Sequence, residues 1–176
     1  MRKLVVLFCA IAALTAAVAA WAAQPEPGTL SVERGRGSVM IDLKGSVVGR
    51  ITSGTLRVTD HTPNDRYAAV VSGRKLTQER MGPRTILYRG QGLRFRMLGG
   101  GYRMVARGSG ITVSAVGRGV VILDGDPPRY AGDEAGVYSL DGADCSVEPD
   151  SCLPLPTEPE RYDLVPPATP QPKAVS

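Results

Sequence analysis

Hydrophobic and polar residues alternate over short stretches of this chain, and glycines separate most of these stretches. A period of two is typical of a β-strand with one buried face, whereas an amphipathic helix has a period of about 3.6. Only residues 77–81 are compatible with a helical turn. The pattern therefore predicts an all-β domain, with short strands at residues 30–33, 39–44, 47–52, 55–59, 68–71, 85–88, 93–98, 102–107, 111–115, 120–123 and 137–139.

Residues 92–124 predict a particular set of strand pairs. Phe95 and Met97 alternate with arginines, so they lie on one face of a strand. A turn at the following glycines would place Met97 opposite Tyr102, and a one-residue slip of this register would bury arginines. Two further glycine turns extend the pair to a four-stranded meander. We expect an antiparallel β-sandwich or small barrel built on this C-terminal meander.

Glycine spacing points to a second architecture. Glycines recur near valines in two regions, at Gly35, Gly37, Gly45 and Gly49 and again at Gly108, Gly110, Gly117 and Gly119. Turn-rich repeats of this kind can stack as a short β-solenoid, which is the alternative fold. The intervals are irregular, which favours the sandwich or barrel.

The N-terminus has the composition of a signal peptide. Arg2 and Lys3 precede an uncharged apolar run at residues 4–20, and Ala20-Trp21-Ala22 matches the small-x-small pattern that a signal peptidase requires. We expect cleavage after Ala22 and a secreted or cell-envelope location. Residues 4–23 are also long enough for an uncleaved anchor, so a membrane-anchored protein is the alternative.

The cysteines and prolines suggest the remaining boundaries. Without the leader, the chain keeps Cys145 and Cys152, and an even pair in an exported protein usually forms a disulfide. Two cysteines without a nearby histidine do not supply the four ligands of a zinc site. We expect a signal peptide at residues 1–22, a linker at 23–28, a β-domain at 29–142, a disulfide loop at 143–153 and a proline-rich, extended or disordered tail at 154–176.

The net charge of +4 hides an uneven distribution. Residues 24–123 carry 16 basic and 6 acidic side chains, whereas residues 124–176 carry 3 and 11. In the meander register Arg96 lies opposite Arg103, and Arg94 and Arg107 share their outer face. These four arginines are the candidate ligand-binding residues. Like charges paired across strands repel one another unless a counter-charge lies between them.

Three interpretations of this charge pattern stay open. In the first, the acidic segment at residues 124–150 folds back over the basic sheet. In the second, the arginines bind an anionic envelope polymer or an anionic lipid surface. In the third, the arginines reflect only the codon bias of a GC-rich genome. Nucleic acid is disfavoured, because the protein is expected to be exported and its basic face has no aromatic stripe for bases to stack on.

Residues suited to catalysis or metal binding are few, and we assign no catalytic residue, metal ligand or cofactor. His61 lies between Asp60 and Asp65 in a predicted turn, but a general base would also need a nucleophile such as Ser53 or Ser72. Neither of two short-spaced aspartate pairs continues into a calcium loop, so both are interpreted as ordinary turns: Asp124 with Asp126, and Asp141 with Asp144.

Several segments rich in glycine and arginine carry a resemblance. They are Arg94-Phe95-Arg96, Gly99-Gly100, Tyr102-Arg103, Arg107-Gly108-Ser109-Gly110-Ile111, Ser114-Ala115-Val116-Gly117-Arg118-Gly119 and Tyr138-Ser139-Leu140-Asp141-Gly142 through Cys145. This part of the chain resembles uncharacterised secreted all-β proteins of GC-rich bacteria. The resemblance implies a secreted location and a β-fold, and it carries over no site residues.

These observations favour a secreted, cell-envelope-associated β-domain with a structural or polyanion-binding role and without enzymatic activity. The alternative is a hydrolase that acts on an envelope polymer through two carboxylates. Such a pair would have to lie about 5–10 Å apart in a cleft. The acidic residues gather in the part of the chain with the weakest strand pattern, which favours the binding role.

Overall fold

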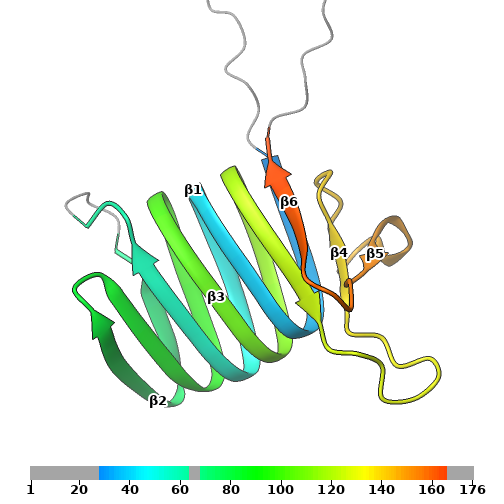
Figure 1. The fold of residues 1–176 in the computed structure, drawn as a ribbon, viewed down its shortest axis with the longest axis horizontal. Helices are drawn as coiled ribbons and strands as arrows, with labels where there is room; N and C mark the ends of the chain where they lie inside the picture. Colours follow the sequence, from blue (N-terminus) through cyan, green and yellow to red (C-terminus); the bar gives the residue numbers. More distant parts are fainter. Residues whose placement is uncertain (1–27, 64–67, 166–176) are drawn as a thin grey trace, which may run out of the picture. The chain divides into compact units, whose positions relative to one another are not determined.

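The computed structural model describes residues 28–63 and 68–165, all of which belong to one unit, Pro27–Pro167. They form a six-stranded antiparallel sheet (Figure 1) and a short 3-10 helix. The elements are β1 (Gly28–Asp60), β2 (Val70–Gly82), β3 (Thr85–Gly125), β4 (Val137–Ser139), η1 (Pro149–Ser151), β5 (Leu153–Pro154) and β6 (Glu160–Leu164). The all-β prediction is confirmed.

Several predictions fall on other parts of the chain. The expected leader, nearly all of the linker and the last eleven residues of the tail lie outside the described residues. Within residues 28–63 and 68–165, no helix is long and apolar enough to cross a membrane.

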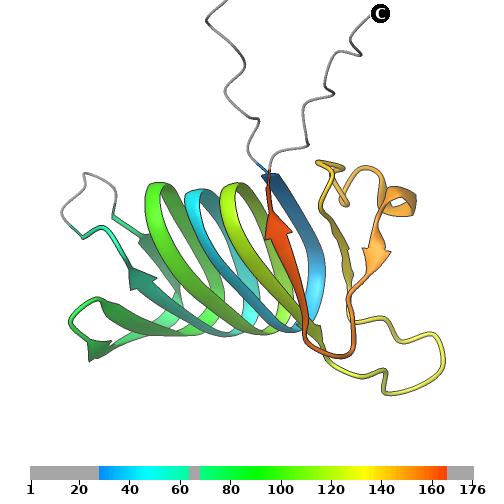
Figure 2. The same ribbon diagram turned by 45° about the horizontal axis from the view of Figure 1, so that its top comes forward.

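β1 and β3 are very long strands that wind around each other. Val39 of β1 pairs with both Ala106 and Leu123 of β3, which are 17 residues apart along the chain. Ala106 in turn pairs with both Val39 and Leu56. The two strands therefore form a coil in which passes of β1 and β3 alternate and run antiparallel (Figures 1 and 2).

Glycines occupy the bends of this coil. Gly54 pairs with Gly108, and their φ angles are 153° and 140°. A Cβ atom on Gly54 would lie 2.0 Å from the carbonyl oxygen of Arg107, so only glycine lets the two backbones approach this closely. Intervals of eight or nine residues recur along both strands, at Gly28, Gly37, Gly45 and Gly54 in β1 and at Gly90, Gly99, Gly108, Gly117 and Gly125 in β3.

Inward-facing aliphatic and aromatic side chains fill the coil. One buried row crosses five neighbouring passes and consists of Leu123, Val39, Ala106, Leu56 and Tyr88. At Gly49 the missing side chain makes room for an aromatic ring, because a Cβ atom there would lie 2.5 Å from Cζ of Phe95. The alternating pattern seen in the sequence thus separates a continuous core from two outer surfaces.

The predicted C-terminal meander is wrong. Met97 pairs with Val47 rather than with Tyr102, and Tyr102 pairs with Leu43. The glycines between the two segments bend β3 without reversing it. The neighbours of residues 93–98 are β1 and β2, and those of residues 102–107 are two passes of β1. The sheet encloses one core by coiling, and its path of paired strands stays open from β2 to β5. The solenoid alternative also differs from this arrangement, since neighbouring passes come alternately from two antiparallel strands.

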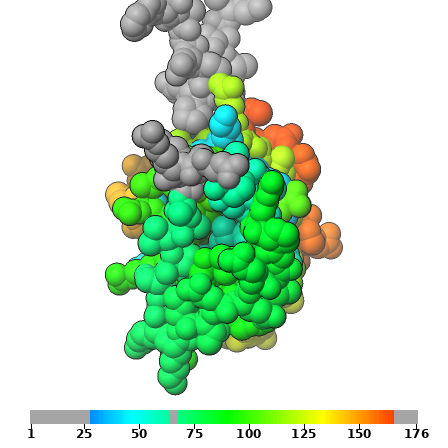
Figure 3. Space-filling view, turned by 90° about the vertical axis from the view of Figure 1, so that its left-hand side faces the viewer, coloured from blue at the N-terminus to red at the C-terminus, as the bar shows by residue number. Residues whose placement is uncertain are grey.

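The two ends of the coil are covered by different strands. At one end β2, together with the first residues of β3, makes up most of the visible surface (Figure 3). Residues 77–81 belong to this strand and form no helical turn. At the other end β4 pairs with residues 31–33 of β1, and β6 pairs with residues 119–123 of β3.

The tail prediction needs one correction. β6 lies within the proline-rich segment that was expected to stay extended or disordered, yet it joins the sheet. Its five residues, Glu160–Leu164, contain no proline, so their N–H groups can pair with β3. Proline composition alone therefore overestimated how much of the C-terminus leaves the sheet.

Candidate functional site

The bends divide the outer surface of the coil into two faces. The Arg94 face comprises residues 29–33 and 46–52 of β1, 91–98 and 112–116 of β3, and 70–74 of β2. The Arg103 face comprises residues 38–44 and 55–60 of β1, 85–89, 102–107 and 119–124 of β3, 77–82 of β2, and β6.

The four predicted arginines are split between these faces. Arg94 and Arg96 lie on the Arg94 face, whereas Arg103 pairs with Asp42 and Arg107 with Ser38 on the Arg103 face. The prediction that the four share one surface is therefore wrong, because it depended on the meander register.

Arg94 lies between two polar neighbours on adjacent passes. Its Cα partners are Arg50 of β1 and Ser72 of β2. The like-charge cross-strand pair is thus Arg94 with Arg50, in place of the predicted Arg96 with Arg103. Nη2 of Arg50 also lies 3.4 Å from Oε1 of Glu33. In the described part of the chain, no carboxylate lies within 4.0 Å of the guanidinium groups of Arg94 and Arg96.

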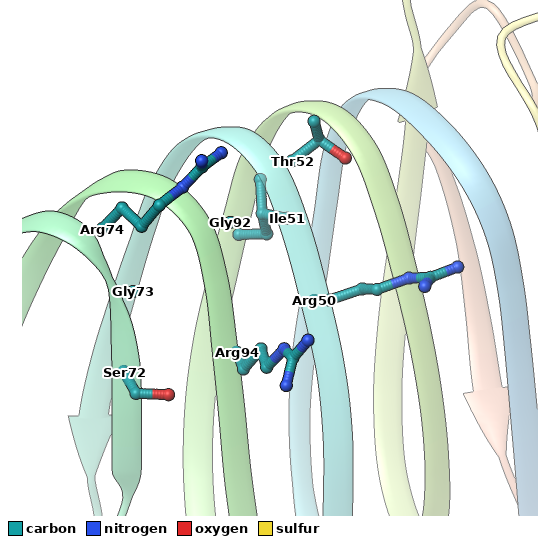
Figure 4. Close-up of a pocket in the computed structure, with 8 residues that line it drawn as sticks. All are labelled: Arg50, Ile51, Thr52, Ser72, Gly73, Arg74, Gly92 and Arg94. Carbon is teal, nitrogen blue, oxygen red and sulfur yellow. The ribbon is translucent and has the colours of Figure 1, made fainter.

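A groove of about 440 Å³ opens on the Arg94 face (Figure 4). It is lined by Arg50, Ile51, Thr52, Ser72, Gly73, Arg74, Gly92 and Arg94. In Figure 4 the side chains of Ser72, Arg94 and Arg50 project to the same side from three neighbouring passes. The three guanidinium groups supply positive charge and hydrogen-bond donors, and the hydroxyl groups of Thr52 and Ser72 can also donate to an acidic ligand. This combination suits phosphate or carboxylate groups.

The arginines of the Arg103 face have acidic neighbours. Nη2 and Nε of Arg103 lie 2.6 and 2.8 Å from Oδ2 of Asp42, whose Oδ1 lies 3.3 Å from Nε2 of His61. Nη2 of Arg89 lies 3.4 Å from Oε2 of Glu79. A smaller groove of about 170 Å³ on this face is lined by Thr55, Arg57, Met81, Leu87, Arg89, Val105 and Arg107. Positive and negative charges are therefore mixed on the Arg103 face.

The acidic segment at residues 124–150 neutralises Arg36. Asp133 accepts two hydrogen bonds from the guanidinium group, at 2.8 and 3.0 Å, and Oδ2 of Asp126 lies 3.6 Å from Nε. The hydrogen bond from Arg36 is the largest of the causes that hold the pKa of Asp133 below its ordinary value. The acidic segment thus contacts the sheet at Arg36, but no ion pair of the kind that the first interpretation requires joins it to Arg94 or Arg96.

A second groove of about 440 Å³ lies at the other end of the Arg94 face, against residues 142–146. Glu33 and Asp144 are among its lining residues. Glu33 contacts Arg50, and Asp144 accepts hydrogen bonds from the hydroxyl and the backbone N–H of Ser146. These bonds lower the pKa of Asp144, with the hydroxyl as the larger cause. A general acid in a hydrolase needs a raised pKa, whereas the pKa of Asp144 is lowered.

The disulfide prediction is confirmed. Sγ of Cys145 lies 2.07 Å from Sγ of Cys152, and Cys145 is buried. The bond closes a loop that includes Ser146, one of the residues that line the second groove.

The remaining candidates for chemistry do not come together. His61 lies beside Asp42 and donates its backbone N–H to the carbonyl oxygen of Gly101, whereas Ser72 lies on the Arg94 face. Ser53 is next to a glycine bend and pairs with residues of β3, and Asp65 lies outside the described residues. Among residues 28–63 and 68–165, no three His, Cys, Asp or Glu side chains are grouped so that they could hold a metal ion.

The groove also contains residues that sequence reasoning missed. Arg50 and Arg74 join Arg94 only through strand pairing, since they are far from it along the chain. No known protein family, curated protein or solved structure matches this chain.

Proposed function

We propose that this protein binds clustered anionic groups of the cell envelope through its Arg94 face. The observation that carries the proposal is the groove that Arg50, Arg74 and Arg94 line without an acidic side chain among the lining residues. Guanidinium groups match phosphates and carboxylates through paired hydrogen bonds.

The pairing of Arg94 with Arg50 adds a second argument. Like charges on directly opposed strand positions destabilise a sheet, and sheets usually avoid them. A bound anion between the two guanidinium groups would remove this repulsion. Glu33 lies 3.4 Å from Arg50 and offsets part of the repulsion, whereas no described carboxylate lies within ion-pair distance of Arg94.

The envelope location is part of the same proposal. Two features support it: the expected leader in the sequence and the Cys145–Cys152 disulfide, which is typical of oxidising compartments. The partner would then be an anionic polymer or lipid surface outside the cytoplasm. The role is binding or organisation of that partner, and no catalytic step is assigned.

The test is binding of inorganic polyphosphate, a soluble polyanion, measured by titration at low and high salt. We expect Arg50→Ser/Arg94→Ser to weaken binding on the order of tenfold, which corresponds to about 1.4 kcal/mol. The matched control is Arg57→Ser/Arg107→Ser, which removes two exposed arginines from the Arg103 face and should change affinity less than about twofold.

Two results would overturn the proposal. Equal losses in the two double variants would mean that net charge alone drives binding. Unchanged binding in Arg50→Ser/Arg94→Ser would remove the groove from consideration. A pull-down against isolated envelope fractions should show salt-sensitive capture, since exposed charges are screened over about 10 Å at 0.1 M salt.

A further inference from the structure

Aliphatic side chains are exposed on the Arg94 face beside its arginines. Val48 and Val116 each expose 41% of their surface, Leu98 exposes 44% and Val70 exposes 53%. On the Arg103 face the outward-facing Val105 exposes only 8%. Four of the exposed hydrophobic residues on the sheet therefore lie on the same surface as Arg94 and Arg96, whereas Met81 of β2 exposes 55% on the Arg103 face and Leu153 of β5 exposes 61%.

The aliphatic and basic side chains occupy adjacent rows across the strands. Arg96 is the Cα partner of both Val48 and Val70, so one row reads Val48–Arg96–Val70. In the row on one side of it, Ser46 lies between Val116 and Leu98. The row on the other side is Arg50–Arg94–Ser72. Because neighbouring passes are about 4.8 Å apart, apolar and cationic groups alternate over short distances.

We infer that the Arg94 face docks on the surface of an anionic lipid membrane. This inference rests on the proposed function and names its partner. A soluble polyanion presents charge but nothing that covers Val48, Leu98 or Val70. A membrane surface presents phosphates at the headgroup level and apolar chains just below them. It can therefore contact the arginines through its phosphates and the aliphatic side chains through its apolar chains.

The charge of the face fits the same partner. Arginines near an anionic bilayer each strengthen binding about fivefold, and an arginine stem can lie along apolar surface while its guanidinium group stays at the phosphates. Arg96, flanked by two valines, has the surroundings that this arrangement requires. Of the carboxylates that line the second groove, Glu33 contacts Arg50, whereas Asp144 lies in the segment of residues 142–146.

The experiment compares vesicle binding with polyphosphate binding for the full chain. Vesicles of phosphatidylglycerol and phosphatidylcholine are compared with pure phosphatidylcholine, and affinity is taken as the excess over the neutral vesicles, so that any apolar terminus contributes to both. We expect Val48→Thr/Leu98→Thr to lower affinity for the anionic vesicles about fivefold or more while polyphosphate affinity changes less than about twofold. Threonine keeps high strand propensity at both positions, which preserves the fold.

Two further variants make the test independent of folding defects. Leu87→Thr/Val120→Thr is the matched control on the Arg103 face and should change neither affinity. Ser114→Leu adds an aliphatic group beside Val48 and should tighten vesicle binding about two- to fivefold without changing polyphosphate binding. Melting curves of all variants confirm that they are folded.

The outcomes separate this inference from the proposed function. If the wild-type protein binds polyphosphate but does not prefer anionic vesicles, the membrane inference is overturned and the anion-binding function stands. If Val48→Thr/Leu98→Thr weakens both ligands equally, the aliphatic row has no specific role and the inference again fails. If neither ligand binds, both the inference and the proposed function are overturned.

Discussion

The two faces of the coil are built from the same strands, yet the side chains beside their arginines differ. On the Arg103 face, Asp42 and Glu79 lie within ion-pair distance of Arg103 and Arg89. On the Arg94 face, the described residues offer Arg94 and Arg96 no carboxylate partner. Since the backbone arrangement is shared, the difference lies in which side chains occupy the outward positions. The contrast concerns these residues in particular, because the described carboxylates also leave Arg57 and Arg107 of the Arg103 face without an ion pair, and Glu33 contacts Arg50 on the Arg94 face.

The largest expected effect comes from breaking the bends that separate the faces. Gly54→Ala would place a Cβ atom 2.0 Å from the carbonyl oxygen of Arg107, at a φ of 153°. We expect it to lower the free energy of unfolding by about 3 kcal/mol, measured by urea titration. Gly82→Ala is the control, because no atom lies within 4 Å of its Cβ position, and it should change stability by less than about 0.5 kcal/mol. Equal effects would mean that the bends do not depend on glycine.

The next effect is specific to one end of the Arg94 face. Reduction of the Cys145–Cys152 disulfide frees the loop beside the second groove, and the chain-entropy relation for a loop this short gives a loss of about 2.5 kcal/mol. Thermal melts with and without reductant measure it, with Cys145→Ser/Cys152→Ser as the variant that should no longer respond. Polyphosphate binding at the arginine groove should stay unchanged, and a parallel loss would contradict the separation of the two grooves.

A smaller effect tests whether ion pairs weaken polyphosphate binding by the Arg103 face. Asp42→Asn removes the carboxylate beside Arg103 and His61 and leaves the positive charge of Arg103 without its partner. We expect polyphosphate affinity to rise about threefold at low salt, as the Arg103 face becomes more like the Arg94 face. Asp150→Asn removes an exposed carboxylate at η1 and serves as the control for net charge. A similar rise in both variants would show that the ion pair has no special role.

The smallest effect concerns the like-charge pair. Arg94→Ser removes the repulsion with Arg50 and should raise the free energy of unfolding by about 0.3 kcal/mol at low salt. In about 1 M salt the gain should disappear, because the screening length falls to about 3 Å. Arg107→Ser, which pairs with no arginine across the strands, should show no such salt-dependent gain.

Much of the local structure was predictable from the sequence. Alternation placed Phe95 and Met97 inward and Arg94 and Arg96 outward, and the structure agrees. The cysteine pair was predictable because only one pairing remained after the expected leader. Both results depend on residues close together in the chain, where the period of a strand fixes which side chains share a face.

The path of the strands was not predictable in the same way. A glycine such as Gly108 fits a turn as well as a bend, and nothing local distinguishes the two. The distinction comes from the partner, since Gly108 pairs with Gly37 and Gly54 of a strand more than 50 residues away. Intervals of eight or nine residues between glycines were the available signal. Grouping Gly35 and Gly49 with the others made those intervals look irregular.

The candidate site was also predictable only in part, namely where it depends on residues close together in the chain. The sequence placed Arg94 and Arg96 on an outer surface, but it paired them with the wrong arginines. Arg50 and Arg74 join the groove through contacts of β1 and β2 with β3. When residues come together only through such distant strand pairing, the sequence around each of them gives no signal of the contact.

The alternation of β1 and β3 passes also constrains how the chain reaches its native state. Pairing can begin near Thr59 and Thr85, which are 26 residues apart, and must then proceed outward toward Gly28 and Gly117. The passes of β1 at residues 38–60 each lie between two passes of β3, so the paired strands have to coil as pairing proceeds. Contacts of such long range make folding slow. During synthesis the whole of β1 precedes every one of its partners. The N-terminal half of the domain therefore cannot fold first, and the chain stays without its core until β3 has been made.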